Sequence, residues 1–168
     1  DTADVYSRWA SGIGGESETI LGNWMKKRAN RQQLIIATKV GKDMGNGRIG
    51  LSKKYILQAV NDSLKRLQTD YIDLYQSHDD DKKVPLEETL DAYQQLIKEG
   101  KVRYIGASNY SAERLKEALD LSSRYHLPRY ECLQPHYNLM ERQLFEGPTE
   151  HLCLKEGLGV IPYYSLAS

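Results

Sequence analysis

The 168-residue chain lacks an excess of charge of either sign, because 23 Lys and Arg residues balance 23 Asp and Glu residues. This balance gives no electrostatic reason to expect binding to nucleic acid or to an anionic membrane surface. The chain also lacks any apolar run approaching the ~18 residues that are needed to span a bilayer. Its length and composition are those of a soluble globular domain with a core of its own.

Cysteine is scarce as well. Cys132 and Cys153 are the two cysteines, and they have neither the spacing of metal ligands nor a disulfide framework around them. We expect both to be small buried apolar residues of a protein in a reducing compartment, and hence a cytoplasmic location.

Short apolar runs alternate with amphipathic segments, which predicts strands and helices in alternation. The clearest helical stripe follows Ser52, a residue type that favours a helix N-cap. This stripe comprises Ile56, Ala59, Val60, Ser63, Leu64 and Leu67. We expect strands at residues 34–38, 71–76, 103–107, 131–134 and 159–162, and helices at 16–27, after 52, at 85–99, after 111 and, less regularly, at 141–156.

This strict order predicts a parallel sheet with right-handed helical crossovers. An open doubly wound sheet usually carries a glycine-rich phosphate loop that leads directly from its first strand into a helix, and we find none in that position. A (β/α)8 barrel instead assembles its site from polar residues at the carboxyl ends of many strands. Such residues are present here: Asp1, Lys39, His78, Ser108, Asn109, Gln134, Tyr163 and Tyr164. We therefore predict an α/β fold of the TIM-barrel type.

The number of strands is smaller than a closed barrel needs. Five strands are expected, plus one that would end just before Asp1. We expect residues 1–168 to form a single partial (β/α)8 domain of a longer protein, from the end of the second barrel strand through the seventh. Open strand edges favour pairing with another chain, so a homo-oligomer is possible.

Four strand-end residues suggest proton-transfer chemistry. Asp1, Tyr6, Lys39 and His78 supply an acid, a phenol, an amine and an imidazole. Each has a structural alternative: a solvated Asp, a packed Tyr, a Lys that reaches solvent, and a His beside an acidic turn. A metal-dependent hydrolase is a further reading, because Asp79, Asp80 and Asp81 follow His78. The second-strand His and His-x-His ligands of such barrels are absent, and no metal site is predicted.

Seven motifs occur in a fixed order: D-T-A-D-V-Y, G-E-S-E-T-I-L-G, A-T-K-V-G, L-Y-Q-S-H, I-G-A-S-N-Y-S, Q-P-H-Y-N-L-M-E-R and Y-Y-S-L-A-S. Together they resemble the aldo-keto reductase family over essentially the whole chain. The Y-N-L-x-x-R form is similar to the microbial and potassium-channel-β-subunit-like branch. Where the family often has Tyr-Gly, this chain has Tyr6-Ser7, followed by a stretched loop at residues 8–15.

The resemblance implies a catalytic tetrad of Asp1, Tyr6, Lys39 and His78. It also implies NADPH as the cofactor, with NADH left open because the segment that binds the 2′-phosphate would follow residue 168. The cofactor contacts would come from Ser108, Asn109 and Gln134 on the carboxamide, Tyr164 on the nicotinamide ring, and Ser165, Leu166 and Ser168 in the pyrophosphate loop.

The function that follows from the resemblance is the reduction of a small aldehyde or ketone to an alcohol. A free tyrosine has a pKa near 10, so an adjacent ammonium that favours the phenolate form is expected to make it a better proton donor. Tyr6 would be that donor, assisted by Lys39, Asp1 and His78. The alternative is a non-catalytic subunit of the same fold that binds or senses the nicotinamide cofactor.

Overall fold

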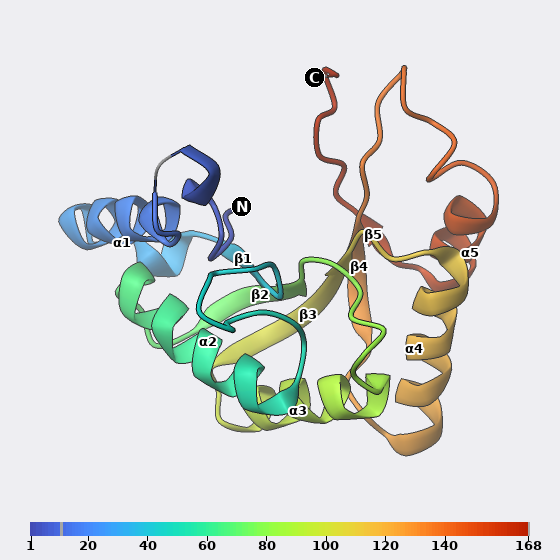
Figure 1. Cartoon of the computed structure of the whole chain (residues 1–168), viewed down its shortest axis with the longest axis horizontal. Coiled ribbons are helices and arrows are strands. Elements are labelled where there is room, and N and C mark those ends of the chain that lie inside the picture. The colour runs from blue at the N-terminus through green and yellow to red at the C-terminus, as the bar shows by residue number, and fades with distance from the viewer. Residues whose placement is uncertain (11, 168) are drawn as a thin grey trace.

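A computed structural model describes residues 1–10 and 12–167. In these residues five parallel strands pair in chain order, β1-β2-β3-β4-β5. Five α-helices follow one another around the outer side of the curved sheet (Figure 1). This is the α/β arrangement predicted for a portion of a (β/α)8 barrel. The strands are β1 (Ala37–Val40), β2 (Ile72–Ser77), β3 (Val102–Ser108), β4 (Tyr130–Gln134) and β5 (Gly159–Val160).

The helices form where the sequence places apolar stripes and caps. Ser52 and Ser111 accept hydrogen bonds from the N–H groups of Tyr55 and Arg114, so the N-cap predicted at Ser52 is confirmed and Ser111 caps the helix expected after it. All six residues of the predicted stripe after Ser52 are buried. The helices are α1 (Glu16–Arg28), α2 (Lys53–Leu67), α3 (Leu86–Lys98), α4 (Ala112–Tyr125) and α5 (Pro148–Glu156), with short 3-10 turns at η1 (Arg8–Ala10) and η2 (Arg31–Gln33).

Several predicted boundaries differ from the structure by one or two residues, and two elements differ by more. The strand expected at residues 34–38 begins only at Ala37, because strand pairing starts opposite Leu74 of β2. Ile35 lies before this point and is 85% exposed. The strand also continues to Val40, so Lys39 lies inside the strand rather than at its outlet. The helical region expected to begin at residue 141 contains turns up to residue 147, and helix begins at Pro148.

Gly45, Gly47 and Gly50 match the spacing G-x-G-x-x-G, but the loop that contains them does not have the geometry of a phosphate loop that opens a helix. The Met44 N–H donates to the Arg48 carbonyl, and the Gly50 N–H donates back to the Gly41 carbonyl. The segment is therefore folded on itself before α2 begins at Lys53.

The first residues of the chain extend the sheet beyond β1. The Thr2 N–H donates to the Ala37 carbonyl at 2.9 Å, and the Asp4 N–H donates to the Lys39 carbonyl at 3.2 Å. This strand-like register brings the segment at residues 1–6 against Lys39. No helix of the described residues is both long enough and apolar enough to cross a membrane.

Candidate active site

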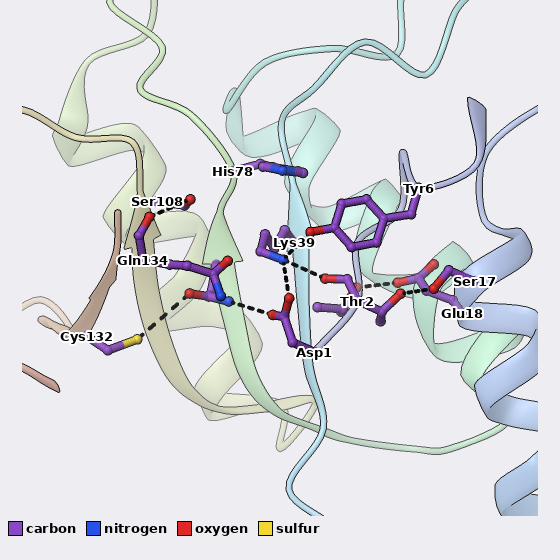
Figure 2. A network of polar contacts seen from close by, with 12 residues as sticks. Asp1, Thr2, Tyr6, Ser17, Glu18, Lys39, His78, Ser108, Cys132 and Gln134 are labelled. Carbon is purple, nitrogen blue, oxygen red and sulfur yellow. Dashed lines mark hydrogen bonds and ion pairs between the residues drawn. The ribbon is translucent and has the colours of Figure 1, made fainter. Parts of the chain in front are cut away.

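Lys39 is the centre of the predicted tetrad. Its Nζ donates to Asp1 Oδ2 at 2.8 Å, to Tyr6 Oη at 3.0 Å and to the Thr2 carbonyl at 3.0 Å (Figure 2). An ammonium group has three N–H donors, and here each has an acceptor. The side chain is 1% exposed, so the ammonium points in one fixed direction toward the phenol oxygen.

Burial and neighbouring groups act on the Lys39 ammonium in opposite directions. Burial lowers the pKa of Lys39, while the hydrogen bond and charge interaction with Tyr6, and the carboxylate of Asp4, act to raise it. The ion pair with Asp1 compensates part of the desolvation through direct contact. The cation therefore lies directly beside the oxygen of the predicted proton donor.

His78 follows β2 and completes the tetrad from the next strand. Its ring is 5.9 Å from the Tyr6 ring, centroid to centroid, in an edge-to-face arrangement. Burial, with the nearby Lys39 and Lys42 cations, lowers the pKa of His78 to about 3. The imidazole is thus neutral at neutral pH. Its Nδ1 is buried and has no hydrogen-bond partner among the described residues.

The predicted carboxamide contacts lie on the two following strands. Ser108 Oγ donates to the Gln134 carbonyl at 2.9 Å, which joins the ends of β3 and β4. The Gln134 side-chain amide makes no hydrogen bond to another described residue, so it is free to pair with a ligand. The Asn109 amide is engaged instead: its Nδ2 donates to the His78 carbonyl at 3.0 Å, and its Oδ1 accepts from the Tyr163 hydroxyl at 2.7 Å.

Tyr164 presents an accessible aromatic ring, which is 59% exposed. It lies edge-to-face against both His136 and Tyr163, at centroid distances of 5.5 and 5.2 Å. The next two predicted contacts, Ser165 and Leu166, lie in an exposed turn that follows Tyr164. Ser168, the last predicted contact, lies outside the described residues.

One pocket with a volume of about 680 Å³ joins the two predicted groups of residues. Asp1 and Lys39 do not line it, but both are linked to it through Tyr6. The arrangement places a phenol, a neutral imidazole and an unpaired amide around one space, which suits proton transfer to a bound polar ligand. Of the predicted residues, those that line the pocket are Tyr6, His78, Ser108, Asn109, Gln134 and Tyr164.

The structure adds participants that the sequence reasoning missed. Thr2 contributes through its backbone carbonyl, which no side-chain pattern reveals. Gln76 lies opposite Lys39 in the sheet register, and its Nε2 donates to Asp1 Oδ1 at 3.4 Å. Its shared strand parity with His78 was a usable signal. Trp9 also lines the pocket, and so does Tyr163, which was expected at a strand end but was given no role. Among the described residues, no group of three or more His, Cys, Asp or Glu side chains could hold a metal ion.

Comparison with known proteins agrees with the family resemblance found in the sequence motifs. The sequence model described as the aldo/keto reductase family matches residues 1–168. The chain is 38% identical to protein tas of Escherichia coli over 175 residues, which cover 90% of this chain and 50% of that protein. It is 41% identical to aldo-keto reductase YhdN of Bacillus subtilis, over 88% of this chain and 41% of that protein.

A third relative matches the predicted branch of the family. The chain is 38% identical to a putative voltage-gated potassium channel subunit beta of Schizosaccharomyces pombe, over 87% of this chain and 42% of that protein. The chain thus spans half or less of the length of the three relatives described here.

Proposed function

Because the chain belongs to the aldo/keto reductase family, we propose that the complete protein is a carbonyl reductase that converts aldehydes or ketones to alcohols. NADPH is the proposed reductant, with NADH as the alternative, and the cytoplasm is the proposed location. The observation that carries this proposal is the contact of the Lys39 ammonium with Tyr6 Oη at 3.0 Å beside the pocket.

The proton is the part of this reaction that the chain's own residues manage. Tyr6 Oη donates it to the carbonyl oxygen of the substrate as negative charge develops there. The Lys39 ammonium stabilises the charge left on the phenol oxygen, and Asp1 holds the ammonium in place. The neutral His78 imidazole contributes a hydrogen bond to the same substrate oxygen, and such a bond is worth most where water is excluded.

A nicotinamide cofactor, when bound, supplies the hydride that this reduction consumes. Gln134 suits its carboxamide, because the side-chain amide lies on the pocket with no hydrogen bond to another described residue. Ser108 offers its hydroxyl oxygen at the same place, and Tyr164 offers a ring face. Asn109 would have to exchange its bond to Tyr163 for one to the cofactor.

Replacement of Tyr6 by phenylalanine tests the assignment in the complete protein. The Tyr6→Phe variant retains the ring but loses the hydroxyl proton, so turnover should fall by about 10²–10⁴-fold. Cofactor affinity, measured by fluorescence titration, should change little. Tyr125→Phe is the matched control, because Tyr125 is an exposed tyrosine at the end of α4 and does not line the pocket. Wild-type rates of NADPH oxidation by Tyr6→Phe with an aldehyde panel would rule out Tyr6 as the donor.

A second function is a non-catalytic subunit that binds the cofactor. The similarity to a protein named as a putative channel subunit favours it. The same assay separates the two functions: saturable cofactor binding with no aldehyde-dependent NADPH oxidation by the complete wild-type protein identifies the regulatory subunit.

A further inference from the structure

Trp9 is a large apolar side chain on the wall of the pocket, beside the predicted proton donor. Its ring lies 5.6 Å from the Tyr6 ring, centroid to centroid, with an interplanar angle of 72°. The residue is 73% exposed, so it does not belong to the packed core. Neither the proton transfer nor the cofactor contacts described above use it.

The backbone on both sides of Trp9 is held in place. Ser7 has a φ of 79°, a left-handed conformation that is uncommon for a residue other than glycine. This turn directs the Ser7 carbonyl to accept from the Ala10 N–H at 3.0 Å. Arg8 is bound to the loop before α2 through the carbonyl and the carboxylate of Asp43. The tryptophan is therefore carried on an anchored turn rather than on a free loop.

The polar groups of the pocket already have assigned partners or roles. Tyr6 and His78 face the reacting oxygen, and Ser108 and Gln134 suit the cofactor. The Lys42 ammonium is paired with the Asp79 carboxylate at 2.9 Å. The remaining lining residues are Val5, Trp9, Tyr163, Ser7 and Ser17, and Ser17 already accepts a hydrogen bond from Thr2. Val5, Trp9 and the ring of Tyr163 supply the apolar surface that is left for the substrate's own substituent.

We propose that Trp9 is a specificity-determining residue that binds the ring of an aromatic aldehyde or ketone while its carbonyl oxygen contacts Tyr6. This inference rests on the proposed reductase function. An aromatic pair prefers centroid distances of about 4.5–7 Å in stacked or edge-to-face geometry. A substrate ring next to Tyr6 and Trp9 can reach such a distance, because these two rings are themselves 5.6 Å apart.

The test compares benzaldehyde with cyclohexanecarbaldehyde, which has a similar size but no π system, in the complete protein. Trp9→Leu keeps an apolar side chain and removes the aromatic one. The contribution of an aromatic pair beyond apolar contact corresponds to about 2- to 12-fold. We therefore expect Trp9→Leu to lower kcat/KM for benzaldehyde by that factor more than for cyclohexanecarbaldehyde, mainly through KM. Trp9→Phe should recover most of the loss.

Trp24→Leu is the matched control, since Trp24 is the other tryptophan of the chain and lies on α1, outside the pocket. It should leave the ratio of the two substrates unchanged. Equal losses for both aldehydes in Trp9→Leu, or no loss, overturn the role of Trp9 while the reductase function stands. Absence of wild-type turnover with every aldehyde overturns the proposed function itself, and this inference with it.

Discussion

Glu18 links three elements around the candidate site, and its replacement by glutamine is a quantitative test of that link. The carboxylate is fully buried and accepts from Arg66 Nε and from Thr38 Oγ1, both at 2.6 Å. Thr38 precedes Lys39 in β1, and Arg66 belongs to α2. Helix α1 is thus attached to both β1 and α2 through one side chain.

The expected change in the free energy of unfolding follows from the hydrogen bonds that a glutamine at position 18 retains. Its amide oxygen can accept from Arg66, and its amide N–H can donate to the Thr38 hydroxyl, so both contacts persist. Hydrogen bonds to a charged group are worth about 1.5–3 kcal/mol, against about 1 kcal/mol for neutral pairs. Loss of the negative charge also relieves repulsion with Asp4. We expect Glu18→Gln to lower the free energy of unfolding by about 1–2 kcal/mol.

Removal of Arg66, the cationic partner of Glu18, should lower the free energy of unfolding by more than Glu18→Gln does. Arg66→Met leaves the fully buried Glu18 carboxylate without its cation, which costs about 3–5 kcal/mol. The Arg66 side chain, in contrast, is 22% exposed and can be solvated when residue 18 is neutral. The double variant should therefore be more stable than Arg66→Met alone, because glutamine removes the unpaired buried charge.

Urea denaturation followed by circular dichroism measures these differences at one pH and ionic strength. Glu87→Gln on the exposed surface of α3 is the control and should stay within about 0.5 kcal/mol of wild type. Additive effects of Arg66→Met and Glu18→Gln, or a smaller loss of stability in Arg66→Met than in Glu18→Gln, would refute the role assigned to this buried ion pair.

Two further predictions concern the same region. Burial raises the pKa of Asp4 from 3.8 to about 7. Between these two values the native state binds a proton that the unfolded chain has released. This proton binding stabilises the native state at low pH, and the stabilisation is lost as pH rises from about 4 to about 7. The free energy of unfolding of wild type minus that of Asp4→Asn should therefore fall by about 2 kcal/mol from pH 5 to pH 8, and a pH-independent difference would contradict it. A Cβ on Gly22 would overlap the backbone of Arg66 and Leu67. Gly22→Ala should therefore lower the free energy of unfolding by about 2 kcal/mol, which a shift of the urea midpoint would show. Lys27→Ala on the same helix is the control and should leave the midpoint unchanged. An unchanged midpoint for Gly22→Ala would show that α1 and α2 separate at little cost.

Much of the fold could be predicted, because local periodicity and caps agree with the tertiary structure. The stripe after Ser52 requires an apolar surface to cover, and the sheet provides it. The run at residues 34–38 is the instructive exception. Its composition favours a strand, but the partner strand pairs only from Ala37 onward. Apolar composition contains no information about where a neighbouring strand begins.

The candidate site could be predicted from the sequence only in part, for a related reason. Lys39, one residue before the end of β1, and His78, directly after β2, could be found from their positions in the sequence, and the structure brings them together with Asp1 and Tyr6. The Thr2 carbonyl could not be found, since a backbone acceptor has no residue-type signature. The bond between Tyr163 and Asn109 spans 54 positions of sequence, so only the folded chain reveals it.

The attachment of residues 1–4 to β1 has a consequence for how the site can fail. Two backbone hydrogen bonds, at Thr2 and Asp4, define the alignment of this segment. A slip by two residues would restore equivalent bonds and keep side chains on the same face, yet it would carry Asp1 about 7 Å along the strand. Lys39 would then lose its carboxylate, while the sheet retained its hydrogen bonds. Inactive protein with normal secondary structure is thus a state that this edge of the sheet permits.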